Sequence, residues 1–287
     1  MEKDVLENYQ KAMKINDSVV AYVKRIDFEG KKILNIAEEI ENVIRSLNGK
    51  PAWPVNININ EIAAHYTPDV NDTIVLKADD LVNIDIGVQV NGYISDKAFT
   101  VCVGKSKHPL IEASEKGLKE AIKLIKPGTK IFEISDVVEN TVNELGFNVV
   151  RNLCGHAVER FNQHAHPSIP NGKNTIQEEI KSDTVIAMEV FTTDGSGWVV
   201  ESSPSLIFKY KQDRPIRLPE ARQILEISKK KFDMLPFAKR WIKEVSPFKF
   251  DMAIRQLIES EALYDYPPLK EKENGMVAQT EETIIVK

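Results

Sequence analysis

The sequence predicts an α+β fold, in which helices and antiparallel strands mix without a regular strand–helix–strand repeat. Two helical segments open the chain, an Asn-Gly turn joins two strand-like segments near residue 91, and another strand-like segment ends it. With 287 residues, of which 42% are hydrophobic, the chain is long enough to bury a sizeable core. We therefore expect a globular protein of mixed secondary structure.

The first part of the chain shows both kinds of periodicity. Residues 5–47 contain two predicted helices, and in the second one apolar residues recur every three or four positions between Ile33 and Leu47. Residues 55–60 alternate Val or Ile with Asn, which predicts a half-buried strand. Two alternating segments within residues 82–103 flank an Asn-Gly pair, which is the strongest short-range signal for a β-hairpin.

The rest of the chain continues this mixture of elements. The predicted segments are, in order, helices at 110–126 and 130–145, a strand at 147–150, a β-rich stretch at 174–210, a mostly helical stretch at 219–262 and a final strand at 276–286.

A weak internal repeat connects the two halves. A shift of 98 residues places Gly30 on Gly128, each just before a predicted helix, and a histidine follows at nearly the same distance in both copies, His65 and His164. A true duplication predicts two halves related by a pseudo-two-fold axis, with both histidines facing a shared centre. The alternative is that two amphipathic helices of one length coincide by chance.

Composition and charge exclude several classes of protein. The formal net charge is −5, so no global positive charge draws the chain to DNA, RNA or an anionic membrane. No run of about 18 apolar residues is present, and the first residues are charged, so neither a membrane span nor a secretory signal is expected. Cys102 and Cys154 are too few for a disulfide framework and match no zinc motif. These features predict a reducing, cytoplasmic setting.

Two short runs of cations remain to be explained. We interpret Lys229-Lys-Lys231 and Lys239-Arg240 as a solvated helix face. Transient contact with a ribosome is the alternative interpretation.

Two aspartates fall within the predicted hairpin. A two-residue turn at Asn91-Gly92 places Asp96 opposite Gly87, with Asp85 one diagonal step away on the same sheet face, roughly 7–8 Å apart at Cα. Two ionised carboxylates repel, and burial is costly for both unless a cation pairs with them. A divalent metal would resolve the conflict, and so would exposure of this face to solvent.

Three further residues could complete a metal site. His156 follows a glycine, and neutral imidazole is a common metal ligand, although a lone histidine is more often structural. Glu189 is the single carboxylate of an apolar strand and needs a partner if buried. Glu281 and Glu282 point to opposite faces of the last strand, so one can enter a site while the other stays solvated. The combined set suits a pair of Mn, Fe, Co or Zn ions bridged by carboxylates.

The order of these residues and their neighbours resembles the methionine aminopeptidases of the pita-bread metallopeptidase family, and the type II branch in particular. The resemblance extends from about residue 5 to the end of the chain. It is carried by Pro54-Val-Asn-Ile-Asn-Ile-Asn-Glu-Ile-Ala-Ala-His-Tyr-Thr-Pro68, Val82-Asn-Ile-Asp-Ile-Gly-Val88, Gly92-Tyr-Ile-Ser-Asp96, Gly155-His156, His164-Ala165, Ser168-Ile-Pro-Asn171, Met188-Glu-Val-Phe191, Ile216-Arg-Leu-Pro219, Tyr266-Pro-Pro-Leu269 and Ala278-Gln-Thr-Glu281.

The resemblance implies a pita-bread fold with pseudo-two-fold symmetric halves, forming one catalytic domain over residues 1–287 with a helical insertion at about 210–270. It also implies the role of each site residue. The metal ligands would be Asp85, Asp96, His156, Glu189 and Glu281, holding two divalent ions. His65 and His164 would be non-ligand histidines near the scissile amide and carbonyl, Glu189 would shuttle the proton, and Trp53 would form a wall of the methionine pocket, where Phe is usual.

The implied activity is removal of the N-terminal methionine from nascent polypeptides, by hydrolysis through a metal-bridging hydroxide. We expect a monomer, and the lack of a long charged N-terminal extension resembles the archaeal type. The alternatives are another pita-bread peptidase, such as an X-Pro aminopeptidase or prolidase, or a non-catalytic pita-bread protein that binds a ribosome or RNA. Four positions depart from the family pattern and put substrate range in doubt: Trp53, His166, Val190 and Glu282.

Overall fold

A nine-stranded sheet forms the centre of the computed structural model, which describes residues 1–287. Seven strands follow one another across it, and every pairing is antiparallel. Their order is β1 (Lys50–Pro51), β4 (Leu81–Val90), β5 (Tyr93–Cys102), β15 (Val277–Ile285), β9 (Val185–Thr193), β7 (Cys154–Glu159) and β8 (Asn162–Pro170), while β2 (Asn56–Ile59) pairs with β4 and β6 (Asn148–Val149) pairs with β9. The predicted α+β class is confirmed.

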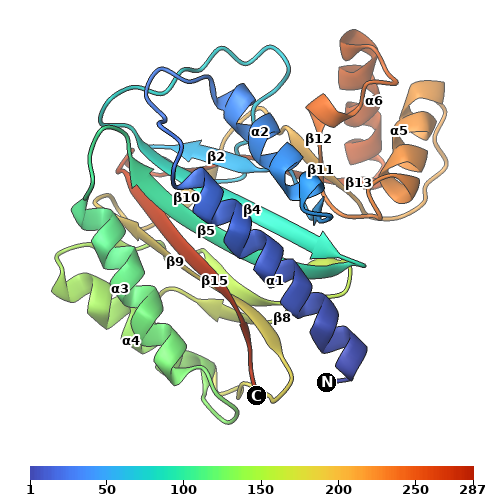
Figure 1. The fold of residues 1–287 in the computed structure, drawn as a ribbon. Coiled ribbons are helices and arrows are strands. Elements are labelled where there is room, and N and C mark those ends of the chain that lie inside the picture. Colours follow the sequence, from blue (N-terminus) through green and yellow to red (C-terminus); the bar gives the residue numbers. More distant parts are fainter.

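Two pairs of helices pack against this sheet (Figure 1). The helices are α1 (Lys3–Val23), α2 (Ile33–Ser46), α3 (Pro109–Leu124) and α4 (Ile131–Glu144). α1 lies against β4 and β5, and α3 lies against β15 and β9. Each pair covers its own buried cluster, with Ile84 and Ile86 of β4 in one and Met188 and Val190 of β9 in the other. Because side chains alternate along a strand, the residues between these apolar positions face the other side of the sheet.

The predicted hairpin is present in the expected register. Asn91 and Gly92 form the turn with φ values of 53° and 87°, both in the left-handed region that such turns require. The register places Gly87 opposite Asp96 and Asp85 opposite Ala98.

The internal repeat is visible in the hydrogen bonds before α2 and α4. These helices begin 98 residues apart, at Ile33 and Ile131. Ahead of each, a glycine in the left-handed region donates its N–H to a carbonyl, from Gly30 to Leu76 and from Gly128 to Ile180, both at 2.9 Å. The two halves meet where β5 lies beside β15, as the pseudo-two-fold prediction requires.

Some details of the secondary-structure prediction were wrong. The segment at 55–60 was expected to be half-buried, but Asn56 and Asn58 are as buried as their apolar neighbours. Their amide oxygens accept backbone N–H bonds from His65 (3.0 Å) and Tyr66 (2.9 Å), because the following segment folds back over β2. Residues 174–184 form no strand, and the sequence patterns did not predict β7 and β8.

Residues 219–262 are mostly helical, as predicted, and they pack beside a small sheet whose other two strands lie just outside that range. The elements of this region, at the upper right of Figure 1, are α5 (Pro219–Lys230), α6 (Pro247–Glu259), a 3₁₀ turn at Lys239–Trp241 and the sheet of β12 (Phe237–Ala238), β11 (Ile207–Tyr210) and β13 (Leu263–Tyr266). They enclose a hydrophobic cluster of their own. A third sheet joins β10 (Val199–Glu201), β14 (Leu269–Glu271) and β3 (Ile62–Ala64).

Arg240 does not lie on a solvated helix face, so that interpretation was wrong for this residue. Its guanidinium is buried and pairs with the buried carboxylate of Glu41 in α2. The indole of Trp241 donates to the same carboxylate at 2.8 Å. A buried carboxylate requires such a partner, and this one joins α2 to the 3₁₀ turn. None of the helices combines the length and apolarity that a membrane crossing demands.

Two threonine hydroxyls hold the seam between β5 and β15. The Thr100 hydroxyl donates to the carbonyl of Gln279 and accepts from its N–H, both at 2.8 Å. The Thr283 hydroxyl does the same for Asp96, both at 2.7 Å. Each bridge replaces a direct bond between the backbones, and one comes from each half of the molecule.

We expect Thr283→Val to lower the free energy of unfolding by about 2–4 kcal/mol, because it leaves two buried backbone groups unpaired at about 1–3 kcal/mol each. Urea denaturation would measure the loss. Thr283→Ser keeps the hydroxyl and should cost clearly less. An equal loss in both variants would show that packing of the methyl group, not the hydroxyl, holds the seam.

Candidate metal centre

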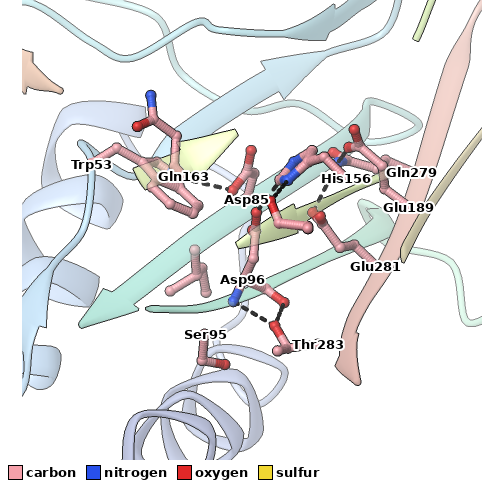
Figure 2. A network of polar contacts seen from close by, with 12 residues as sticks. Trp53, Asp85, Ser95, Asp96, His156, Gln163, Glu189, Gln279, Glu281 and Thr283 are labelled. Carbon is pink, nitrogen blue, oxygen red and sulfur yellow. Dashed lines mark hydrogen bonds and ion pairs between the residues drawn. The ribbon is translucent and has the colours of Figure 1, made fainter. Parts of the chain in front are cut away.

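The residues singled out in the sequence line one cavity of about 310 Å³ on the sheet face opposite the helices. Its wall contains Trp53, His65, Asp85, Asp96, His156, His164, Glu189 and Glu281. Figure 2 shows most of these side chains converging from separate strands. The predicted set is therefore brought together in space.

The strand register explains how the carboxylates meet. Asp85 of β4 lies opposite Ala98 of β5, Ala98 lies opposite Glu281 of β15, and Glu281 lies opposite Glu189 of β9. One row across four strands thus carries three carboxylates around a small alanine. Asp96 stands two positions from Ala98 on the same strand and face. We call Asp85, Asp96, Glu189 and Glu281 the carboxylate cluster.

The carboxylate cluster is poorly satisfied by the protein itself. Asp96 Oδ1 and Glu281 Oε1 are buried without a hydrogen-bond partner. Burial raises the pKa of Asp85 to about 6. Burial, together with the neighbouring carboxylates, also raises the pKa of Asp96, Glu189 and Glu281 well above the usual range. No lysine or arginine contributes to these pKa shifts, so a bound cation would resolve an electrostatic conflict.

One histidine completes the donor set. Single ligand atoms from Asp96, His156 and Glu281 lie within 4.8 Å of one another, and all three residues are buried. Burial lowers the pKa of His156 to about 4, so its imidazole is neutral. Its Nδ1 lies 3.2 Å from the carbonyl of Ala157, and its Nε2 lies 3.8 Å from Asp96 Oδ2. Oxygen donors with one neutral imidazole fit a divalent transition metal.

Gln279 belongs to this site although sequence reasoning did not single it out. Its Nε2 donates to Glu189 Oε2 of the neighbouring strand at 2.8 Å and to Glu281 Oε2 of its own strand at 3.3 Å (Figure 2). The available signal was its position two residues before Glu281, which places both side chains on one face.

The two remaining histidines of the predicted set, His65 and His164, also line the cavity. His65 has φ of 66°, its Nδ1 lies 3.2 Å from the carbonyl of Pro267, and its ring packs edge-on against Tyr266 at 5.3 Å. Burial lowers its pKa to about 4. His164 packs against His156 at 4.6 Å and leaves its own ring accessible from the cavity. Tyr266 accepts a hydrogen bond from Gln163 at 2.8 Å, and neither had been predicted as a site residue.

Three of the four departures from the family pattern lie outside the cavity. Val190 points into the core below α3, because it alternates with Glu189. His166 is 75% exposed and pairs with Glu178 at 2.7 Å. Glu282 pairs with Lys97 at 2.5 Å on the opposite face from Glu281. Trp53 is the fourth departure, and its indole lines the cavity beside Asp85.

Known proteins resemble this chain over nearly its whole length. The model for metallopeptidase family M24 matches residues 7–286. A methionine aminopeptidase from Thermococcus onnurineus is 44% identical over 277 residues, which cover 96% of this chain and 92% of the relative.

Solved structures resemble the fold as well. A thermophilic Arx1 has a TM-score of 0.87 at 18% identity, covering 99% of this chain and 88% of its own. A methionine aminopeptidase from Thermotoga maritima has a TM-score of 0.72 at 21% identity, covering 100% and 94%. These two likenesses concern the fold alone. The extent of the family match and the identity to the Thermococcus relative show that the chain belongs to metallopeptidase family M24 and, within it, to the methionine aminopeptidases.

Proposed function

We propose that this chain removes the N-terminal methionine from newly made polypeptides by metal-dependent hydrolysis. The observation that carries the proposal is the buried carboxylate cluster with one neutral imidazole, lining the same cavity as two further histidines. The curated relative that is 44% identical is named for this activity. Membership in a metallopeptidase family implies divalent metal ions.

We propose two ions, held by Asp85, Asp96, His156, Glu189 and Glu281. Five side chains with four carboxylates offer more donors than one ion needs, and oxygen with one imidazole suits Mn, Fe, Co or Zn. When bound, the two ions would lower the pKa of a water between them toward neutrality and so supply a bridging hydroxide nucleophile.

The chain's own groups would perform the other tasks. Glu189 would carry the proton from the nucleophile to the leaving amine, since its carboxylate faces the cavity and accepts a bond from Gln279. His164 would donate to the developing oxyanion, because its ring is reachable from the cavity. His65, held by the carbonyl of Pro267, would position the substrate amide. Trp53 would form one wall of a pocket for the methionine side chain.

We place this activity in the cytoplasm and in a monomer, with one catalytic domain over residues 1–287 and an insertion at about 210–270. Transient contact with a ribosome remains a prediction, and it would bring the cavity to emerging chains.

The activity can be tested with metal-stripped protein reconstituted in turn with Mn, Co, Fe or Zn. We expect release of methionine from Met-Ala-Ser, and no release from Leu-Ala-Ser or from an X-Pro dipeptide. His65→Ala should lower kcat/KM by about 100-fold or more, because a positioned polar group at the reacting amide is lost. His166→Ala removes an exposed histidine and should leave the rate unchanged. Release from the X-Pro substrate would indicate a prolidase, and stoichiometric metal binding without turnover would indicate a binding protein.

Metal binding should change the effect of the carboxylate cluster on the stability of the fold. The pKa of Asp85 is raised from 3.8 to about 6, so its contribution to stability is present below pH 3.8 and lost as pH rises through 6. Metal-free protein should therefore become less stable between pH 4 and pH 7, and Asp85→Asn should reduce that loss. With saturating metal the unsubstituted protein should instead be the more stable of the two, because Asp85→Asn lacks one of the proposed ligands.

Thermal unfolding at pH 7, in chelator and in excess Mn, would measure both effects. Asn at this position can still accept the bond from Trp53, so the comparison isolates the charge. A variant that is less stable than the unsubstituted protein in chelator would contradict the electrostatic argument.

A further inference from the structure

Trp53 contacts the proposed metal site through a hydrogen bond as well as through its ring. Its indole Nε1 donates to Asp85 Oδ1 at 3.0 Å, as the dashed line in Figure 2 shows. No other side chain or backbone group donates to Asp85. The position of this carboxylate, at the end of the row across the sheet, therefore depends on a single donor.

Gly87 packs directly against the indole of Trp53. It lies two residues after Asp85 on the same strand and face, opposite Asp96. A Cβ atom added at Gly87 would lie 2.4 Å from Trp53 Cε2 and 2.5 Å from two further ring carbons, which is closer than atoms can approach. The indole thus rests flat against the bare backbone of β4, and Trp53 is buried. Any side chain at this position would move the indole.

This geometry fixes one of the two oxygens of Asp85. Oδ1 receives the indole N–H, which orients the carboxyl plane, and Oδ2 receives no hydrogen bond from the protein. A donor that holds a ligand carboxylate in one rotamer removes an entropic cost of metal binding, and loss of such partners typically costs about 10–100-fold in affinity.

We infer that Trp53 is a positioning residue for Asp85: its indole N–H, seated on Gly87, holds the carboxylate ready for a divalent ion. The inference rests on the proposed metal site. A phenylalanine at this position would supply the aromatic wall of the cavity but no donor, so the ring and the N–H carry separable effects.

The test is the affinity of the metal-free full-length protein for Mn²⁺, measured by isothermal titration calorimetry. Trp53→Phe should raise the Kd about 10–100-fold, and the visible spectrum of the Co²⁺ form should change because the ligand geometry changes. Trp198→Phe makes the same chemical change at a residue that is 49% exposed, and should alter neither quantity.

Gly87→Ala is a second variant that retains the tryptophan. As a single substitution it should weaken Mn²⁺ binding, because it displaces the indole. In the Trp53→Phe background it should cause no further loss of affinity. An additive loss in the double variant would overturn the inference, because Gly87 would then act on the ligands directly. Far-UV circular dichroism would establish that each variant is folded.

A Kd within about twofold of the unsubstituted protein in Trp53→Phe, with an unchanged Co²⁺ spectrum, would also overturn the inference. Because these measurements use no substrate, they are independent of the peptidase assay. Absence of methionine release would contradict the proposed function and leave the affinity difference intact. Failure of the unsubstituted chain to bind Mn²⁺ or Co²⁺ would overturn the metal site and this inference together.

Discussion

Four carboxylates crowd one face of the central sheet, and two of them, Asp96 and Glu281, are buried. Glu189 and Glu281 lie directly opposite each other in adjacent strands, where like charges repel. The only side-chain hydrogen-bond donors to the cluster are the uncharged groups of Trp53 and Gln279. Such an arrangement lowers the stability of the metal-free fold, and a bound cation would offset the repulsion.

The two halves of the molecule contribute different residues to the site. The first half brings Asp85 and Asp96 on its hairpin, and the second brings His156 and Glu189. The last strand then inserts Glu281 at the seam between them. Neither half holds the complete donor set, so the site exists only once the seam is closed. The threonine bridges across that seam therefore stabilise the fold and hold the carboxylates of both halves in register.

The region between β11 and β14 completes the cavity rather than standing apart from it. Ile207 and Tyr266 line the wall, and the carbonyl of Pro267 holds His65 Nδ1. The buried pair of Arg240 and Glu41 joins the same region to α2. Arg240 is buried between two partly exposed neighbours, and breaking its pair with Glu41 would leave a charge buried without its partner.

The hairpin, its register and the shared face of Asp85 and Asp96 followed from the residues alone, because an Asn-Gly turn and a period of two fix the pairing of the strands. The sequence also determined the order of donors along the chain, and the similarity in order was enough to indicate the family. Long-range packing, by contrast, buries β2 on both sides, pairs Arg240 with Glu41, brings Gln279 to the carboxylates and places Gly87 under the indole of Trp53. Those outcomes depend on contacts between residues far apart in sequence, which local periodicity cannot report. The bond from Trp53 to Asp85 is of this kind, since it joins residues 32 apart through a gap that a missing Cβ leaves open.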